Sequence, residues 1–439
     1  MRPIPFPPRL GMDALKPINT IPLLKRLQWR MECLGHSLIE LIAGLLPGTL
    51  VFAIGECMAG LAWHLMPKRR FGVIRNLRVA YGDTMSIDEI HDLAKTSFRR
   101  VGGNLLSAAH TARLSPAELA EVLRIENLEL LEEALGKGRG VVLLLSHMGN
   151  WELLSRLIHF FPEGTKAGAM YRPLNNQFMD ERVCARRQAD GTRMFSKRDP
   201  FHQITGFLRG GGLVGVLADQ RMGPNGDLVH FFGRLTRASP LPSLLARRAK
   251  SEVLALSMAS DGPGSWVASF GVVESPPSSE HCAAALEAAM RRSPADVFWM
   301  QERWRVRLGR EYNLQQLLED RQSVAGKPHR ALIWLDDRGD GSGLAPIWNH
   351  ADVVYEVAAA QGGAVPEGLP EGTRVHPVEA IGSGECRSVL KSIDEGQTFP
   401  IDFVLTFHRC EALAAACDEL GIPLYLHAAE HVVMPGEDG

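Results

Sequence analysis

The feature that most constrains this chain is a histidine that ends a short apolar run and precedes a carboxylate at a fixed spacing. The apolar run covers 141–145, and a helical-looking segment covers 153–161. Between them lie His147 and, five residues later, Glu152. Because open α/β sheets bind ligands at the carboxyl ends of their strands, this strand–turn–helix layout predicts a site at His147. A histidine that is paired with a carboxylate can act as a general base and take a proton from a hydroxyl.

Length and composition indicate a globular protein of two domains. The chain has 439 residues, more than one ordinary domain needs, with 45% hydrophobic and 22% charged residues. Its 7 cysteines are scattered and form no CxxC pair. This usage argues against a zinc ribbon and a disulfide framework, and it is typical of a reducing compartment. No metal site and no nucleic-acid partner are expected.

Charge is distributed unevenly along the chain. Residues 1–100 carry 14 Lys and Arg against 8 Asp and Glu, whereas residues 325–439 carry 7 against 18. This step predicts a boundary near residue 325. It also favours an anionic partner for the basic part: lipid phosphate, a membrane surface or an acidic carrier protein. The alternative is that charge simply varies between solvated faces.

The N-terminal region combines a proline-rich tail with a long apolar segment. Residues 1–22 read as an irregular tail, and 34–66 are long enough to span a bilayer. Pro47 and Glu56 weaken a straight spanning helix, so a broken hairpin or a helix lying in the interface is the alternative. A buried soluble hairpin also remains open. We predict a membrane-associated helical segment over 23–80.

Strands and helices alternate over 81–322, which predicts an α/β domain with a sheet flanked by helices. Strands are expected at 141–146, 213–218, 253–258 and 266–273. Helices are expected near 179–190, 200–209, 241–250 and 280–292. Two more amphipathic helices, 86–100 and 115–135, each begin with a capping-box pattern.

The acidic C-terminal region, 327–439, follows a predicted linker and is expected to form a small α/β domain. Its strands are predicted at 331–335, 403–407 and 424–427, with a helix at 411–420. A glycine-rich turn, 336–343, resembles nucleotide-sugar glycosyltransferases that act on lipopolysaccharide, but the region is too short for two lobes. We therefore predict an accessory domain, in which His408 and His427 are structural residues.

The motif reads His147-Met-Gly-Asn-Trp-Glu152, an H-x-x-N-W-E pattern. Five further blocks stand around it: Lys68-Arg69-Arg70…Arg75-Asn76-Leu77 comes before it, and Tyr171-Arg172-Pro173-Leu174, Asp219-Gln220, Phe231-Phe232-Gly233 and Trp299…Arg303-Trp304 follow it in order. Together they resemble the bacterial lipid A biosynthesis (late) acyltransferases, within the glycerophospholipid acyltransferase superfamily. The resemblance covers roughly residues 25–310.

The resemblance implies an enzyme that moves an acyl chain from an acyl carrier protein, or from coenzyme A, to a hydroxyl of a lipid A precursor or related glycolipid. It also implies that the enzyme is located at the cytoplasmic face of the inner membrane. The resemblance implies no bound cofactor, because the acyl thioester is a co-substrate. Two alternatives stay open. The same chemistry could act on another phospholipid or glycolipid acceptor, or the chain could be a non-catalytic scaffold that binds lipid or carrier.

For catalysis, we expect His147 to be the general base, because an alcohol is a poor nucleophile while protonated. Glu152 is expected to hold the imidazole in the right tautomer and to stabilise the imidazolium. No enzyme nucleophile is needed if the acceptor hydroxyl attacks the thioester directly. Negative charge then develops on the thioester oxygen, and Arg172 is the candidate to stabilise it.

The remaining candidates are assigned to substrate binding. Asn150 either contacts substrate or is an N-cap. Asp219 and Gln220 end a second strand and are expected at the same sheet edge as His147. Arg303 is a candidate partner for phosphate oxygens. Many family members carry a histidine where this chain has Gln301. The basic scatter over 182–198 is either a solvated face or a docking patch for acyl carrier protein.

Overall fold

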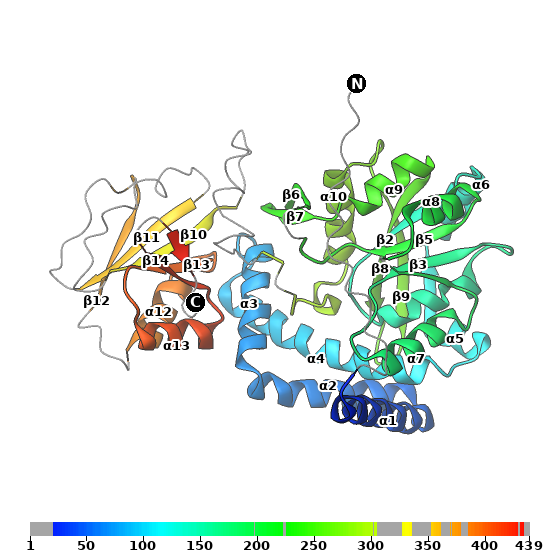
Figure 1. Ribbon diagram of the computed structural model, residues 1–439, viewed down its shortest axis with the longest axis horizontal. Helices are drawn as coiled ribbons and strands as arrows, with labels where there is room; N and C mark the ends of the chain where they lie inside the picture. The colour runs from blue at the N-terminus through cyan, green and yellow to red at the C-terminus, as the bar shows by residue number, and fades with distance from the viewer. Residues whose placement is uncertain are drawn as a thin grey trace.

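The computed structural model of the chain describes residues 21–196, 198–222, 225–301, 303–304, 327–335, 353–360, 369, 371–378, 385–428 and 431–433. Two sheet-based bodies lie side by side, with helix α3 (Pro67–Tyr81) between them (Figure 1). The predicted α/β fold is confirmed. Most of the predicted tail, the linker and the glycine-rich turn lie outside the described residues.

The first body is built on a seven-stranded sheet in the order β1-β9-β8-β2-β5-β3-β4. Its strands are β1 (Leu123–Glu126), β2 (Val141–Leu145), β3 (Ala167–Tyr171), β4 (Arg193–Ser196), β5 (Leu213–Leu217), β8 (Glu252–Ser260) and β9 (Trp266–Val272). Neighbouring strands are parallel except β8 and β9. Central β2 is buried along its whole length, which explains its unbroken apolar run.

Helices cover this sheet and connect its strands. They are α5 (Pro116–Val122), α6 (Leu128–Gly136), α7 (Gln177–Gln188), α8 (Phe201–Arg209), α9 (Leu241–Ala249), α10 (Ser279–Arg291) and the 3-10 helices η2 (Trp151–Phe160) and η3 (Pro294–Asp296). A short hairpin, β6 (Asp227–Phe231) and β7 (Arg234–Ala238), stands apart from the sheet. The single helix predicted over 115–135 was wrong, because strand β1 lies between α5 and α6.

Three N-terminal helices pack as a layer: α1 (Leu23–Leu45), α2 (Gly48–Leu65) and α4 (Ile87–Thr111). Pro47 separates α1 from α2, so the apolar segment is a broken hairpin. Helices α2 and α4 approach closely because both carry glycine at the crossing. A Cβ atom on Gly55 would lie 2.4 Å from the carbonyl oxygen of Gly102.

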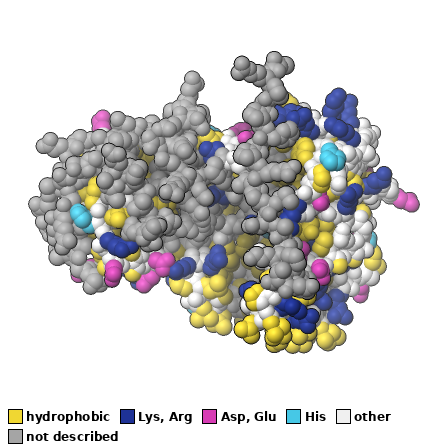
Figure 2. Space-filling model, in the orientation of Figure 1, with side chains coloured by type: hydrophobic (Ala, Val, Ile, Leu, Met, Phe, Trp, Pro, Cys, Tyr) yellow, Lys and Arg dark blue, Asp and Glu magenta, His cyan; other side chains and the backbone are white. Residues whose placement is uncertain are grey.

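One face of this layer is apolar and uncovered. Within the described part of the chain, α2 is the one helix long and apolar enough to cross a membrane. Helix α1 adds Leu24, which is 82% exposed, and α2 adds Leu61, which is 63% exposed. Figure 2 shows the resulting hydrophobic surface along the side of the molecule where α1 and α2 lie. Exposed apolar surface of this extent marks a contact with protein or lipid.

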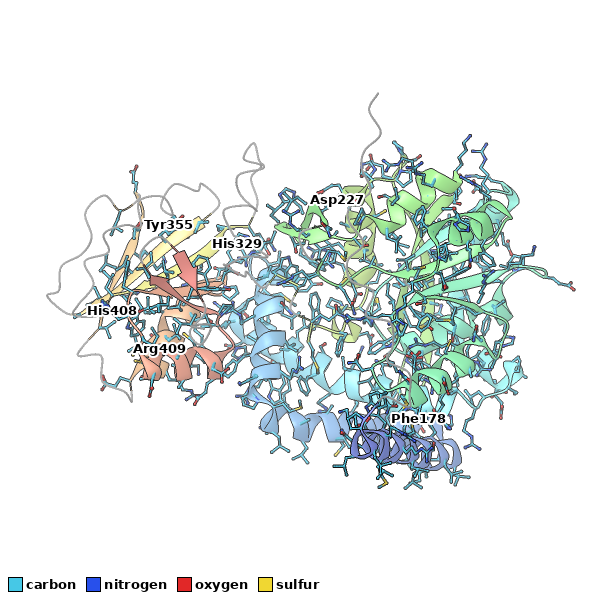
Figure 3. The ribbon with its side chains drawn as sticks, viewed as in Figure 1. Phe178, Asp227, His329, Tyr355, His408 and Arg409 are labelled. Carbon is cyan, nitrogen blue, oxygen red and sulfur yellow. The ribbon has the colours of Figure 1, made fainter. Side chains whose placement is uncertain are left out.

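The second body is a six-stranded sheet in the order β12-β11-β10-β13-β14-β15. Its elements are β10 (His329–Trp334), β11 (Val353–Ala360), β12 (Arg374–Val378), α12 (Cys386–Glu395), β13 (Phe403–Thr406), α13 (Glu411–Leu420), β14 (Leu424–Ala428) and β15 (His431–Val433). All strand pairs are parallel except β14 and β15. In Figure 3, His329 marks the end of this sheet near the first body, whereas His408 and Arg409 lie at the far end.

Buried ion pairs join the two bodies. The Arg78 side chain, 2% exposed, pairs with Asp394 and donates to backbone carbonyls of Asp394, Gln397, Thr398 and Phe399. Arg234 donates to Asp402 at 2.7 Å, and neither side chain is more than 4% exposed. Burial alone raises the pKa of Asp402, but the charge of Arg234 and the nearby imidazole of His329, 3.5 Å away, outweigh it and lower that pKa. The second body is therefore fixed against the first.

Candidate active site

The site forms where two neighbouring parallel strands end. Leu145, the last residue of β2, pairs in register with Leu217, the last residue of β5. His147 and Asp219 each lie two residues further on, so the strand register brings them to the same sheet edge. Asp219 was predicted at this edge, and the structure confirms that placement.

Asp219 holds His147 through two hydrogen bonds. Its Oδ1 lies 2.8 Å from Nδ1 of the imidazole, and its Oδ2 accepts the backbone N–H of His147 at 2.8 Å. The Asp219 side chain is 4% exposed and that of His147 is 16% exposed. A carboxylate on Nδ1 selects the tautomer that carries its proton there. Nε2 therefore keeps its lone pair and is free to accept a proton.

A second segment, 296–301, fixes the backbone around the histidine. Phe298 donates its N–H to the carbonyl of His147 at 2.8 Å, and Gly149 donates to the carbonyl of Asp296 at 2.9 Å. Gly149 adopts φ +55°, and a Cβ atom there would lie 2.3 Å from the carbonyl oxygen of Met258. Only glycine fits this turn, which lets the loop lie flat against β8.

Gln301 and Trp151 complete the surroundings of the imidazole. Nε2 of Gln301 lies 3.1 Å from Nδ1 of His147, so the position where many family members carry histidine contacts the ring directly. The Trp151 ring stands edge-on to the imidazole at 5.5 Å and also contacts Phe298 at 5.6 Å. Trp151 therefore forms one wall of the site.

Glu152 differs from its predicted role. Its carboxylate accepts hydrogen bonds from Arg187 at 2.6 and 3.0 Å and from Arg186 at 3.5 Å. Burial raises the pKa of Glu152, but hydrogen bonds and charges of these arginines outweigh it and lower that pKa. The position against Nδ1 of His147 belongs to Asp219. A catalytic role for Glu152 therefore stays a prediction. Its contacts in the structure support a positioning role, in which Glu152 holds helix α7 in place.

Helix α7 also ties the site to α1. Arg186 donates to Glu40 of α1 at 2.6 Å as well as to Glu152, and Arg182 pairs with the same Glu40 carboxylate. Three arginines of the basic scatter over 182–198 thus make internal ion pairs. This finding weakens its interpretation as a docking patch for an acidic partner.

An apolar cavity of about 720 Å³ opens beside the imidazole. Its walls are Ala59, Ala62, Met66, Arg69, Phe98, Val101, Gly102, Leu105, Gln220, Arg221, Phe298, Met300 and Gln301. Helices α2 and α4 supply most of the apolar wall, and Gln301 both lines the cavity and contacts His147. Its volume lies within the roughly 300–1,000 Å³ that small-molecule sites occupy. Gln220 was predicted to bind substrate, and its place on the wall is compatible with that role.

The other predicted residues are not open to this cavity. Asn150 is buried, makes no cap, and donates to Thr111 of α4 at 3.0 Å. Arg303 is buried with its guanidinium 4.3 Å from the Phe231 ring centroid, and it donates to the carbonyl of Ala218, just before Asp219. Arg172 is exposed at the end of β3, two strands from β2. Asn150 and Arg303 support the loops, and the oxyanion role of Arg172 stays a prediction.

A base held by a buried carboxylate beside an apolar cavity suits proton removal from a hydroxyl of an apolar or lipid-bearing substrate. Residues 24–306 match the family described as Bacterial lipid A biosynthesis acyltransferase. The chain belongs to this family. It is therefore an acyltransferase of the lipid A and glycolipid class, and the match ends before the C-terminal sheet begins.

Three curated relatives show the range of that class. A lipid A biosynthesis palmitoleoyltransferase of Escherichia coli (strain K12) is 24% identical over 271 residues, which is 60% of this chain and 87% of the relative. A lipid A biosynthesis acyltransferase of Shigella flexneri matches to the same extent, 24% over 271 residues. A phosphatidylinositol mannoside acyltransferase of Mycolicibacterium smegmatis is 26% identical over 177 residues, 39% of this chain and 57% of the relative.

Proposed function

We propose that this chain is an O-acyltransferase that moves an acyl chain from a thioester to a hydroxyl of a lipid A precursor or related glycolipid. The observation that carries the proposal is the His147–Asp219 pair beside an apolar cavity. The cavity walls suit an alkyl chain, and the imidazole suits a hydroxyl. The co-substrate is a thioester, and the reaction needs no bound cofactor or metal.

In the proposed mechanism, Nε2 of His147 takes the proton of the acceptor hydroxyl while its oxygen attacks the thioester carbonyl carbon. The Nδ1–H bond to Asp219 stabilises the imidazolium that forms. The tetrahedral intermediate then collapses, the carbon–sulfur bond breaks, and the imidazolium returns its proton to the leaving thiolate. The products are an ester and a free thiol, and His147 is regenerated.

Cations at the cavity suit substrates that carry phosphate. Arg69 is exposed on its wall and Arg221 is half-buried there. Guanidinium groups recognise phosphate oxygens through paired hydrogen bonds. The acyl donor is proposed to be an acyl carrier protein, with coenzyme A as the alternative, since both carry their thiol on a phosphate-bearing arm.

The apolar face of α1 and α2 suits attachment to a lipid surface, here proposed to be the cytoplasmic face of the inner membrane. Because α2 forms both part of this face and part of the cavity wall, a lipid acceptor could enter from the bilayer. Flotation of the full chain with anionic vesicles tests this attachment. Recovery of the chain only in the lipid-free fraction would refute it.

The reaction is tested by incubating the full chain in detergent with acyl carrier protein that carries mixed acyl chains and with a total lipid extract. Parallel samples replace the carrier with coenzyme A thioesters. Mass spectrometry should show a new acylated lipid that a His147→Ala variant does not form. A product that persists in the variant would refute the mechanism. Absence of product from a folded native chain would favour the scaffold alternative.

A different acceptor is the second candidate. The mannoside acyltransferase relative is named for a glycolipid other than lipid A, although it matches a shorter part of this chain. The same experiment decides between the two, because the mass of the product identifies its acceptor.

A further inference from the structure

A second cavity, of about 190 Å³, lies where α3 meets the C-terminal sheet. Its walls are Lys68, Gly72, Arg75, Asn76, Val79, Met300, Trp304, Pro400, Asp402, Cys417, Asp418, Gly421, Ile422 and Pro423. Both bodies contribute, so this cavity requires the C-terminal domain, which lies beyond the family match. Its volume corresponds to a few water molecules at about 30 Å³ each, or to one small ligand.

Two buried donors in this wall have no acceptor among the described residues. Nη1 of Arg75 and Nε1 of Trp304 are both buried without a hydrogen-bond partner, and the Trp304 residue is only 5% exposed. Both groups can only donate. The cavity therefore offers a pair of N–H groups to a ligand that accepts hydrogen bonds.

Within the part of the chain that the structure describes, Arg75 also forms no ion pair, because each nearby carboxylate is already paired with another cation. Asp402 pairs with Arg234, and Asp418 pairs with Lys68 at 2.6 Å. A third carboxylate, Asp394, pairs with Arg78. Burial lowers the pKa of Arg75, although the charges of Asp394 and Asp402 act in the opposite direction. A buried charge normally has a partner, and water alone supplies none.

We propose that this cavity binds a phosphate group that still carries a proton. Its oxygens would accept from Arg75 and Trp304, and its own O–H would donate to Asp402 or Asp418. A carboxylate retains spare lone pairs after one ion pair, so both can accept a further bond. A fully ionised oxyanion has no proton to donate and would meet these carboxylates as like charges.

The cavity is connected to the active site through one side chain and one shared wall. Asn76 lines it and donates to the carbonyls of Trp299 at 2.7 Å and Gln301 at 2.5 Å. Met300 lines both cavities. A phosphate bound beside Asn76 would therefore restrain the segment that places Gln301 against His147.

Calorimetry on the full chain in low-salt detergent buffer tests the proposal with inorganic phosphate, sulfate and glycerol phosphate as probes. Saturable binding of phosphate is expected, with an affinity at least about tenfold higher than that of sulfate. Sulfate has no proton to donate, and the loss of one hydrogen bond to a carboxylate costs about this much. Arg75→Gln should weaken phosphate binding by about tenfold or more, and Trp304→Phe by about two- to tenfold. Tighter binding of glycerol phosphate than of phosphate would identify a phosphate ester as the ligand.

Arg70→Gln is the matched control, because it removes the same charge from the same helix but lines neither cavity, and its guanidinium lies over the Trp63 and Phe71 rings. It should leave phosphate binding unchanged. Loss of binding in Arg70→Gln but not in Arg75→Gln, equal affinity for sulfate, or no saturable binding would each overturn the proposal. Phosphate should also raise the unfolding temperature of the native chain but not that of Arg75→Gln. A cooperative unfolding transition of this variant would show that it is folded, and the missing shift would show that it lacks the phosphate site.

A change in acyl-transfer rate with phosphate, absent in Arg75→Gln, would show the connection to the active site. This last measurement rests on the proposed function, whereas calorimetry and thermal unfolding do not. Failure of acyl transfer would therefore leave the binding result intact.

Discussion

Replacing Asp219 by Asn tests which carboxylate serves the imidazole. Asp219 is almost fully buried and accepts both the ring Nδ1–H and the backbone N–H of His147. A bond from a charged group contributes about 1.5–3 kcal/mol, which corresponds to a rate loss of about 10- to 150-fold. An amide can also donate to Nδ1 and so favour the wrong tautomer, which costs about 10⁴-fold in serine proteases. We expect a 10²- to 10⁴-fold loss of kcat/KM.

Glu152→Gln is the matched comparison, because it neutralises the carboxylate that contacts Arg187 instead of the ring. Acyl transfer should be measured for both variants beside His147→Ala, together with the downfield proton resonance of a hydrogen-bonded imidazole Nδ1. Asp219→Asn should lose that resonance, and Glu152→Gln should keep it. The reasoning is refuted if Asp219→Asn stays within tenfold of the native rate while Glu152→Gln loses both the resonance and the activity.

The other predictions concern stability, measured by unfolding of the full chain in detergent. Gly55→Ala should cost about 1–3 kcal/mol, because its Cβ atom would lie 2.4 Å from the Gly102 carbonyl, whereas Gly60→Ala has room and should be neutral or stabilising. An equal effect of both changes would contradict this packing. Asp402→Asn should cost about 3–5 kcal/mol by leaving Arg234 buried and unpaired. Because folding lowers the pKa of Asp402, its stabilisation is present above about pH 4 and is lost as the pH falls below it. The native chain should therefore lose more stability than Asp402→Asn between pH 5 and pH 3, and parallel losses would exclude this residue as the cause.

Strong local patterns in the sequence predicted much of the fold. Helix 411–420 was predicted with the bounds that the structure gives, and the central strands β2, β5, β8 and β9 were predicted within two residues at each end. Apolar residues dominate these strands, and the helix ends at Gly421, which adopts the left-handed conformation. Strand β1 was missed because its alternating residues, 123–126, also continue the helical pattern of their neighbours. Strands β3 and β4 lie toward the sheet edge, where partial burial leaves a weak apolar signal.

The partner of His147 could not be predicted from local spacing, because it depends on strand register. Glu152 is near in sequence, but its carboxylate contacts Arg187 of α7, which lies 35 residues further along the chain. One signal was available. Asp219 stands at the same offset from the end of its strand as His147 does from its own, and two adjacent parallel strands bring equal offsets together. Gln301 could not be placed in this way, because it arrives from an irregular segment.

Arg78 has a consequence for how such a chain can arise. All the acceptors of its side chain among the described residues lie in 394–399, beyond the family match, although Arg78 itself lies within that match. The structural border between the two bodies thus runs along α3, far from the border that the sequence suggests near residue 325. Adding the C-terminal domain to a chain without matching acceptors would bury the Arg78 cation unpaired. Losing that domain would expose a face of α3 whose residues are suited to burial. The two parts should therefore be inherited as one unit, with substitutions in 394–399 tracking those in α3.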